Sequence, residues 1–599
     1  MTPAPRRPRS LGDSAVTLAI AVVGLVAALI GLLHLAALTV AALTGHSAPT
    51  FHDTLDAVRA RPTNPVGGYV TSPGPAPVIY ALVVVVALAL IVGAVWAGMT
   101  IAGWMTDRRY NRTTLRDLAP MTLSAAQEAA DKVVPAAAAQ ELAPVDRVVA
   151  VCTYRGKPLF AQHEDSFLVI GPPRSGKTSR LVIDWILDAP GAVVITGTKS
   201  DVVYYTHTPR AEKGVVSVFD HGGSITGWPT TLKWDPVAGC EDPDEARERG
   251  RSWAAADPER LSGKNAWFTN QAGEILAFFL HAAALKPGGS MRDVMRWASD
   301  FSSNEPAMVL RSQGAIVDPV TGEAVGAPVV SRGTELWADL LKARTQSQAK
   351  ETAASLGTTL VGLLAALTSP AVLEALCPAP GEGFDIDEFL TGPNTLYLMS
   401  GEGVGSVAPL VTTLAGAVVR RAKDKSQETG RLWPPLALIL DEAANVAPLP
   451  DLPGLMSDSG GRGISVRVIC QSKAQMVQRW SDAGANAIIA AATTQMYLPG
   501  IKDPEHLRAL SEMHGRYRAH RLSASSGHSG GSTTTSSEWE NRLAGDEIRR
   551  LKLGEALMFY RELKSAQVTL TPWWDGKSKD AVEKSAKAAE QLTGRKIDG

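Results

Sequence analysis

The stretch GPPRSGKT, residues 171–178, has the residue types and the spacing of a phosphate-binding loop. It fits the pattern G-x-x-x-x-G-K-S/T and lies between an apolar run and a helix-like run. In such a loop the backbone N–H groups point toward phosphate oxygens, and the following helix adds its positive N-terminal end. Lys177 would then reach the β- and γ-phosphates, and Thr178 would bind Mg²⁺. The sequence therefore predicts a site for ATP with Mg²⁺.

The candidate nucleotide-binding residues form one continuous segment. They are Gly171, Pro172, Pro173, Arg174, Ser175, Gly176, Lys177, Thr178 and Ser179. Arg174 is either a phosphate contact or an exposed charge, and its position in the loop leaves both open. A chance match to the motif is the alternative for the whole loop, but the apolar run before it and the helix-like run after it argue against chance.

An acidic pair follows another apolar run. LALIL, residues 436–440, ends in Asp441 and Glu442. A carboxylate at the carboxyl end of a parallel strand can hold the water shell of Mg²⁺, so we assign Asp441 to the metal, through water. An adjacent carboxylate can polarise the attacking water, so Glu442 is the candidate general base. Two solvated acids at a strand end are the alternative, and the phosphate-binding loop on the same chain favours hydrolysis.

Further candidates surround the run ISVRVIC, residues 464–470. Gln471 follows this run, and its amide can hydrogen-bond the γ-phosphate or the attacking water. Arg462 precedes it in a Gly-rich turn and is a candidate arginine finger across a subunit interface. A solvated loop charge is the alternative for Arg462, and Arg467 is a weaker candidate for the finger. The predicted catalytic residues are therefore Lys177, Glu442, Gln471 and Arg462.

Short apolar runs alternate with helical patterns beyond residue 150, which predicts an α/β fold with a doubly wound parallel sheet. The predicted strands are 166–170, 192–196, 215–219, 395–399, 436–440, 464–470, 494–498 and 556–560. Lys199 and Asp201 follow the second of these strands and either line the ligand site or begin a helix. The long interval between 219 and 395 reads as helical, which predicts an all-α insertion in the α/β domain.

Two apolar runs near the N-terminus, 15–43 and 76–105, contain no charged residue and are long enough to cross a bilayer. A cleaved signal peptide is the alternative for the first run, but the run is too long and a second one follows. Arginines flank the pair on the outer sides, whereas the loop at 44–75 has few. The positive-inside rule then predicts a multi-pass protein of the cytoplasmic (inner) membrane with both termini in the cytoplasm.

These patterns divide the chain into six parts. They are a membrane hairpin at 1–112, a membrane-proximal connector at 113–150, a nucleotide-binding domain at 151–240 and 390–575, an inserted all-α domain at 241–389, a flexible Ser/Gly/Thr-rich loop at 522–538 and a polar tail at 576–599.

The overall composition limits the possible partners. The chain has 59 Lys and Arg against 60 Asp and Glu, so no global basic charge indicates nucleic acid, and a polyanion must be held by a local patch or a pore. The four cysteines lie far apart, which argues against a zinc site or a disulfide framework. The polar triplet at 163–165 could be a metal cluster, but a surface turn is the preferred interpretation.

Taken together, these features resemble the coupling proteins of type IV secretion systems, which are TraG-like conjugative DNA-transfer ATPases of the FtsK/HerA group. The resemblance rests on the N-terminal hairpin and on GPPRSGKT, TKSD (198–201), KWDP (233–236), LILDEAAN (438–445), GGRG (460–463) and VICQS (468–472). The TKSD motif departs from the DPKGE-like sequence that is frequent there, so Asp201 corresponds to the acid only approximately.

The resemblance implies a RecA-like P-loop motor domain with an inserted all-α domain, assembled as a homo-hexamer. It further implies ATP-driven passage of single-stranded DNA, with an attached relaxase, toward the components of a type IV secretion channel. Lys177 and Thr178 would be Walker A residues, Asp441 and Glu442 Walker B residues, and Gln471 the glutamine of the following strand. Two alternatives remain: an ATPase that feeds protein substrates to a secretion channel, and a nucleotide-binding membrane adaptor that does not hydrolyse ATP.

Overall fold

The computed structural model divides the chain into two units, residues 1–112 and 113–599. The residues that the structure describes are 47–60, 113–133, 143–229, 232–257, 265–312, 316–317, 324–325, 334–346, 350–401, 406–527 and 530–597, together with isolated positions between 31 and 96. In the first unit they include helix α2 (Phe51–Ala60).

The predicted membrane spans, 15–43 and 76–105, lie almost entirely outside the described residues. Within the part of the chain that is described, no helix combines the length and the apolar character needed to cross a bilayer. The multi-pass location at the inner membrane, expected from the apolar runs, is therefore corrected on this finding.

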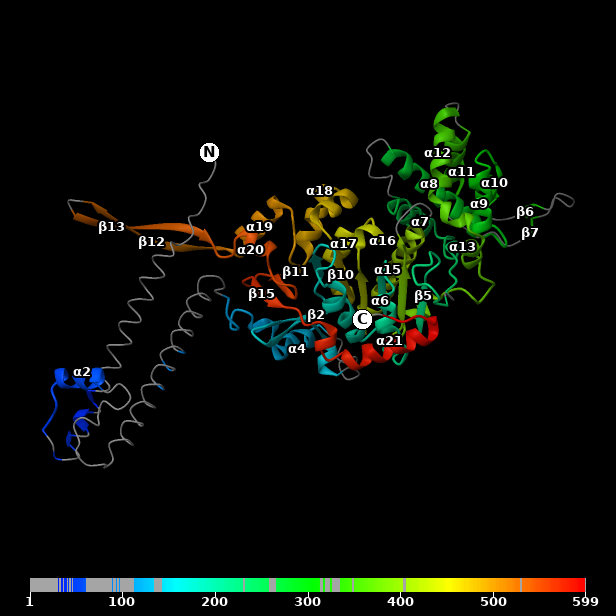
Figure 1. Cartoon of the computed structure of the whole chain (residues 1–599). Coiled ribbons are helices and arrows are strands. Elements are labelled where there is room, and N and C mark those ends of the chain that lie inside the picture. The colour runs from blue at the N-terminus through cyan, green and yellow to red at the C-terminus, as the bar shows by residue number, and fades with distance from the viewer. Residues whose placement is uncertain are drawn as a thin grey trace. The chain divides into compact units, whose positions relative to one another are not determined.

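The second unit is built on an 11-stranded sheet with the order β2-β1-β15-β14-β11-β3-β10-β9-β4-β8-β5 (Figure 1). Its strands are β1 (Val148–Tyr154), β2 (Lys157–Gln162), β3 (Phe167–Ile170), β4 (Val193–Gly197), β5 (Val216–Phe219), β8 (Thr395–Met399), β9 (Leu436–Leu440), β10 (Ile464–Cys470), β11 (Thr494–Tyr497), β14 (Glu555–Tyr560) and β15 (Ala566–Thr569). From β11 to β5 every neighbouring pair is parallel, whereas β14, β15, β1 and β2 add antiparallel pairs at one edge. Every predicted strand is a strand of this sheet, so the predicted α/β fold is confirmed.

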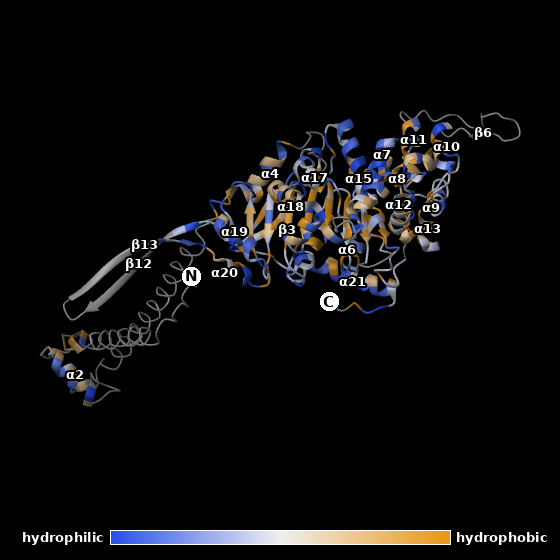
Figure 2. Cartoon of the chain, turned by 90° about the horizontal axis from the view of Figure 1, so that it is seen from above, coloured by the Kyte–Doolittle hydropathy of each residue, from blue (hydrophilic) through white to orange (hydrophobic). Residues whose placement is uncertain are grey.

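Side chains of each central strand alternate between two hydrophobic layers. Leu168 and Ile170 of β3 belong to one layer, and Phe167 and Val169 to the other. Helices α15 (Ala408–Thr429), α16 (Ala443–Val446), α17 (Leu452–Asp458) and α18 (Lys473–Ala491) contribute to the first layer, and α5 (Ile183–Asp188), α6 (Asp201–Ala211) and α21 (Lys579–Thr593) to the second. Figure 2 shows the apolar strands enclosed between these helices. Burial on both faces explains why the parallel strands read as continuous apolar runs.

The interval between β5 and β8 folds mainly as helices. They are α7 (Pro243–Ala255), α8 (Asn265–Leu285), α9 (Met291–Ser299), α10 (Glu305–Ser312), α11 (Thr334–Thr345), α12 (Lys350–Leu363), α13 (Pro370–Ala375) and α14 (Ile386–Phe389), with the short strand pair β6 (Ile316–Val317) and β7 (Ala324–Val325). Figure 1 places α8 to α13 at the end of the unit beyond β5. These helices share one continuous hydrophobic core with a face of the sheet, so they fold as part of the same unit.

The predicted flexible loop at 522–538 is corrected. Its backbone forms most of an antiparallel ribbon, β12 (Arg516–Gly527) and β13 (Gly530–Asn541), which extends from the region of α19 (Pro504–His514) and α20 (Gly545–Arg549) (Figure 1). The threonines of this segment favour extended backbone, and Gly527 pairs with Gly530 at the turn. The low hydrophobicity of this segment indicated disorder, whereas its backbone forms a hairpin through hydrogen bonds between the two strands.

The polar segments at the two ends of the unit also have defined positions. Helix α4 (Leu123–Asp131), in the predicted connector, packs on β1 and β2. Helix α21, in the predicted polar tail, lies along α6. There Ser585 Oγ donates to the carbonyl of Tyr204 at 2.8 Å and accepts from the Thr208 N–H at 3.1 Å. Helix α21 therefore covers α6 on one face of the sheet.

The triplet 163–165, interpreted from sequence as a surface turn, is largely buried. Asp165 has an exposed fraction of 1%, and it accepts hydrogen bonds from the Tyr560 hydroxyl at 3.0 Å and from Arg561 Nη2 at 2.9 Å. His163 is also buried and its Nε2 lies 3.0 Å from the carbonyl of Asp146. The antiparallel strand β14 brings Tyr560 and Arg561 to this point, which the local sequence could not indicate.

Candidate nucleotide-binding site

The predicted phosphate-binding loop leaves the carboxyl edge of the sheet at β3, between β10 and β11. Two ladder hydrogen bonds fix its start: Gly171 N donates to the carbonyl of Cys470 at 3.1 Å, and Leu498 N donates to the carbonyl of Ile170 at 2.9 Å. A Cβ atom at Gly171 would lie 2.9 Å from Leu498 Cβ, so this position excludes a larger residue. Gly176 has φ +84°, which favours glycine there. The loop conformation therefore depends on both glycines of the motif.

Lys177 is folded back into the loop. Its Nζ donates to the carbonyls of Gly171 at 2.7 Å and Pro172 at 2.9 Å, and the side chain is buried. Burial lowers the pKa of this ammonium, while the charges of Asp441 and Glu442 act against that shift. A buried cation held by neutral carbonyls at a loop of this shape fits a site for phosphate groups.

Thr178 and Asp441 meet across the sheet edge. Thr178 Oγ1 donates to Asp441 Oδ2 at 3.3 Å, although β3 and β9 are separated by β10. Thr196 Oγ1 holds the backbone of Asp441 by donating to its carbonyl at 3.0 Å. Burial, and then the neighbouring Glu442 charge, raise the pKa of Asp441 to about 6. A hydroxyl and a buried carboxylate at this distance are hard oxygen ligands of the kind that Mg²⁺ prefers.

Glu442 has a left-handed backbone, with φ 54° and ψ 42°. Non-glycine residues adopt this region rarely, and such strain of about 1–3 kcal/mol is frequent at functional sites. The Glu442 N–H donates to Asp441 Oδ1 at 3.1 Å, and Glu442 Oε2 accepts from Thr198 Oγ1 at 3.2 Å. Sequence reasoning missed Thr198. Its position at the end of β4, next to β9 in the sheet, was the signal that could have found it.

The loop and the acidic pair line one cavity of about 180 Å³. Its lining comprises Pro173, Arg174, Ser175, Gly176, Lys177, Thr178, Ser179, Gly197, Thr198, Lys199, Asp201, Val202, Asp441 and Glu442. Lys199 and Asp201, the weaker predictions, therefore reach the site as well. Burial raises the pKa of Asp201. Arg174 is an exposed residue of this lining.

Gln471 and Arg462 lie outside this lining, at opposite ends of β10. Gln471 follows the carboxyl end of β10, between β3 and β9, and its N–H donates to Gln475 Oε1 at 3.3 Å. Arg462 precedes the amino end of the same strand, and its Nε donates to Asp458 Oδ2 at 2.8 Å. A strand rises about 3.3 Å per residue, so roughly 20 Å separates Arg462 from the loop of its own chain. Arg462 therefore cannot serve the site of its own subunit.

Arg467, the weaker candidate for an arginine finger, is excluded by burial. Its exposed fraction is 1%, and its guanidinium carbon lies 5.6 Å from the Phe167 ring centroid and 5.4 Å from that of Trp185. Burial also lowers the pKa of this guanidinium. Arg467 is thus enclosed between two aromatic rings in the core, where another subunit cannot reach it.

The fold and the cavity define a P-loop protein with a RecA-like parallel sheet. Residues 435–553 match the family described as "TraM recognition site of TraD and TraG". Among solved structures, the plasmid coupling protein TrwB in complex with ADP and Mg²⁺ is 16% identical with a TM-score of 0.50, over 72% of this chain and 92% of that chain. TrwB with the non-hydrolysable GTP analogue GDPNP has the same identity and TM-score, over 71% and 89%. No match is found among curated protein sequences.

At this identity the likeness to TrwB shows the fold. The resemblance to type IV coupling proteins, predicted from the motifs, is confirmed by that fold and by the matched domain. The matched domain contains β9, Asp441, Glu442, β10 and Gln471, so it includes the acidic pair of the candidate site, whereas the phosphate-binding loop lies outside it.

Proposed function

We propose that this chain is a coupling ATPase of conjugative DNA transfer, which binds ATP with Mg²⁺ and hydrolyses it to drive DNA toward a type IV secretion channel. The observation that carries this proposal is the convergence of Lys177, Thr178, Asp441 and Glu442 on one cavity. The domain at 435–553 and the TrwB-like fold support the choice of conjugative transfer among the uses of such a site.

Each residue then has a definite part. The N–H groups of the loop and Lys177 bind the β- and γ-phosphates, and Lys177 exchanges its two carbonyl partners for phosphate oxygens. Thr178 and Asp441 would hold Mg²⁺, Asp441 through its water shell. When bound, Mg²⁺ would supply positive charge that neutralises the charge of the transition state. Glu442 orients the attacking water and takes its proton.

Gln471 and Arg462 act at the borders of the site. Gln471 directly follows β10, the strand between β3 and β9, and its side chain hydrogen-bonds the γ-phosphate or the attacking water. Arg462 serves the site of a neighbouring subunit in a homo-hexameric ring, because it lies at the far end of β10 from its own loop. Its partner Asp458 is an exposed side chain, so the ion pair can open at little energetic cost.

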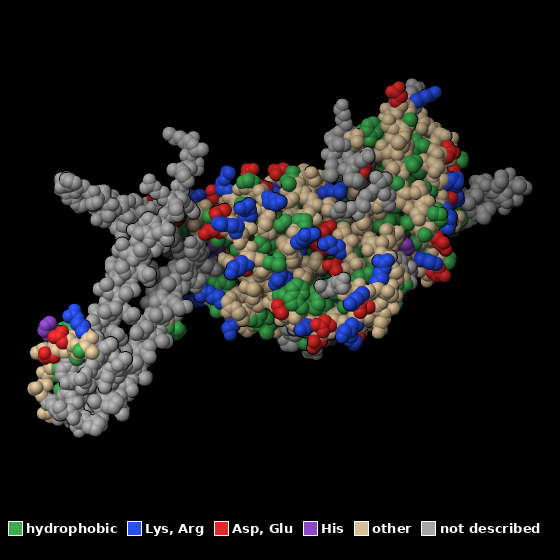
Figure 3. Space-filling model, in the orientation of Figure 1, with side chains coloured by type: hydrophobic (Ala, Val, Ile, Leu, Met, Phe, Trp, Pro, Cys, Tyr) green, Lys and Arg blue, Asp and Glu red, His purple; other side chains and the backbone are tan. Residues whose placement is uncertain are grey.

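The cargo that we propose is single-stranded DNA with an attached relaxase. Figure 3 shows Lys and Arg side chains interspersed with Asp and Glu on the face in view, so that face offers no single basic field. A pore formed by a ring can hold a phosphate backbone with a few cations, without base specificity. A balanced total charge is therefore compatible with DNA as cargo.

The decisive experiment compares wild type with Lys177→Ala in a cellular DNA-transfer assay and in an ATPase assay of the purified full-length chain. We expect both activities to fall by at least about a hundredfold, since the lysine contacts the transferred phosphoryl group. Equal transfer by the two chains would refute the motor. Hydrolysis without salt-sensitive binding of single-stranded DNA would favour protein cargo, and absence of hydrolysis by the assembled wild type on DNA would favour a nucleotide-binding adaptor.

A further inference from the structure

Arg180 lies beside the phosphate-binding loop but outside the cavity lining. Its backbone N–H donates to the carbonyl of Gly176 at 3.1 Å. Its side chain also passes close to the loop, because a Cβ atom at Gly176 would lie 3.0 Å from Arg180 Cδ. At the other end of the side chain, Nη1 donates to the carbonyl of Leu570 at 2.6 Å. The side chain of Arg180 therefore runs from the loop to the segment that follows β15.

An exposed tryptophan lies next to this guanidinium. The Arg180 Cζ atom is 5.9 Å from the ring centroid of Trp574, whose exposed fraction is 43%. The preceding Trp573 is buried, and its ring centroid lies 5.2 Å from that of Tyr205 on α6. Trp573 thus anchors the turn, and Trp574 presents an aromatic surface to solvent beside the P-loop.

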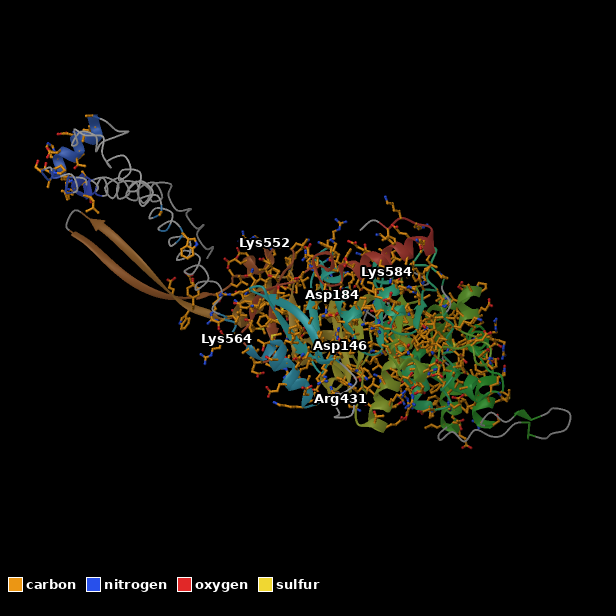
Figure 4. All side chains as sticks on the ribbon, turned by 90° about the horizontal axis from the view of Figure 1, so that it is seen from below. Asp146, Asp184, Arg431, Lys552, Lys564 and Lys584 are labelled. Atoms are coloured by element: carbon orange, nitrogen blue, oxygen red, sulfur yellow. The ribbon has the colours of Figure 1, made fainter. Side chains whose placement is uncertain are left out.

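A second exposed apolar side chain approaches from the loop before β14. Leu553 has an exposed fraction of 62%, and its Cδ1 lies 3.5 Å from the position of a Cβ atom at Gly176. The next residue, Gly554, has φ +93° and leaves room for Arg180, because a Cβ atom there would lie 2.8 Å from Arg180 Nη1. Figure 4 labels the neighbouring Lys552 at the surface of the unit.

From this arrangement we infer that Trp574, together with Arg180 and Leu553, forms the platform on which the base of the bound nucleotide stacks. The inference rests on the proposed function, because it takes the phosphates to lie on the loop at Gly176 and Lys177. Bases stack on aromatic rings and guanidinium planes whatever their identity, since every base has a π-face. The platform therefore favours nucleotides over inorganic polyphosphate without distinguishing adenine from guanine.

A purely structural role for Trp574 is the competing explanation. In that case the Arg180–Trp574 contact would only attach the C-terminal segment to the helix after the P-loop. The two explanations differ in one respect: a base platform affects ligands that carry a base, whereas a structural contact affects every ligand of the loop equally.

The test measures equilibrium binding of ATP, GTP and inorganic tripolyphosphate to the full-length chain. Trp574→Ala is expected to weaken ATP and GTP by about tenfold, which is the range of one base–aromatic stack, and to leave tripolyphosphate unchanged. Trp574→Phe should retain most of the affinity. Trp539→Ala, which removes another exposed tryptophan on β13, is the matched control and should bind all ligands like wild type.

Two results would overturn the inference while leaving the proposed function intact. One is wild-type ATP affinity in Trp574→Ala, and the other is an equal loss for ATP and tripolyphosphate, which would indicate a structural contact. If wild type bound neither ATP nor tripolyphosphate, the proposed function would fail and the platform with it.

Discussion

Thr198 donates from its Oγ1 to Glu442 Oε2 at 3.2 Å, and so connects the end of β4 to the carboxylate at the end of β9. Glu442 sits on strained left-handed backbone, and this hydrogen bond determines where its carboxylate points within the cavity. The hydroxyl thus acts as a positioning group for the proposed general base.

Removing that hydroxyl tests the relationship directly. Thr198→Val keeps the shape of the side chain but loses the donor, and we expect kcat for ATP hydrolysis to fall about tenfold with little change in KM. Thr198→Ser should retain most of the rate because it keeps the donor. Steady-state kinetics measures both constants. A rise in KM at constant kcat would show that Thr198 contributes to binding instead.

The backbone of Glu442 gives a second prediction. Glycine tolerates left-handed φ, whereas alanine does not, so Glu442→Gly should be more stable than Glu442→Ala by about 1 kcal/mol. This order is the reverse of that expected at an ordinary helical position. Denaturant unfolding of the two variants measures the difference, and both should lose hydrolysis.

The negative charge of the ionised Asp441 carboxylate is unfavourable at this buried position until a cation binds beside it. Burial and the Glu442 charge both act against its ionised form, so Asp441→Asn should raise the unfolding temperature in metal-free buffer. The same variant should lose most of the further stabilisation that ATP with Mg²⁺ gives to wild type. Thermal unfolding with and without these ligands checks both parts, and a destabilised metal-free Asp441→Asn would contradict the prediction.

Because His163 is buried, we predict that the free energy of unfolding depends on pH. Burial, and then the nearby Arg467 charge, lower its pKa to about 3 from 6.5. The unfolded chain takes up this proton below pH 6.5 and the folded chain does not, so the stabilisation is complete above pH 6.5 and is lost as pH falls toward 3. Between pH 7.5 and pH 5 the loss is about 2 kcal/mol.

The comparison for His163 uses His163→Gln, which can still donate to the carbonyl of Asp146. The difference in the free energy of unfolding between wild type and this variant should decrease by about 2 kcal/mol from pH 7.5 to pH 5. Denaturant titrations at both pH values measure it. A constant difference would mean that His163 takes up its proton over the same pH range in the folded chain as in the unfolded chain, so that its pKa is not lowered.

Because we propose that Arg462 serves the site of a neighbouring subunit, we predict that two inactive variants complement each other when they are mixed. Arg462→Ala and Lys177→Ala should each be inactive, but a mixture should recover part of the ATPase rate, because mixed rings contain some sites with an intact loop and an intact neighbouring arginine. The measurement is the ATPase rate against mixing ratio. Additive rates without recovery would place Arg462 outside the site of the neighbour.

The core of the fold could be predicted because burial on both faces gives each parallel strand a local signal. At the antiparallel edge β14 was predicted as well, whereas β1, β2 and β15 were not, since these three are partly exposed and the pairing of β1 with β15 joins segments about 400 residues apart. The ribbon at 516–541 was missed for a related reason: its stability comes from pairing between strands, whereas its composition resembles that of a linker.

The residues of the site also fall into two groups, those that the sequence predicted and those that only the fold brings together. Lys177, Thr178, Asp441 and Glu442 were predicted because each belongs to a motif with a fixed place at a strand end. Thr198 lies in the TKSD motif but was given no role there, and Arg180 and Trp574 belong to no motif; the order of the strands and the course of the C-terminal segment bring all three close to the loop. Arg467, the weaker candidate for the finger, lies on a predicted strand, and its burial in the core excludes that role.

Strand β10 has a mechanical property that follows from its place in the sheet. Every residue of Ile464–Cys470 is buried, and the strand is hydrogen-bonded to β3 on one side and β9 on the other. A strand paired along both edges resists stretching and slipping, so Gln471 and Arg462 keep a nearly fixed separation. In the ring that we propose, β10 would therefore carry a movement that begins at the γ-phosphate to the interface with the neighbouring subunit.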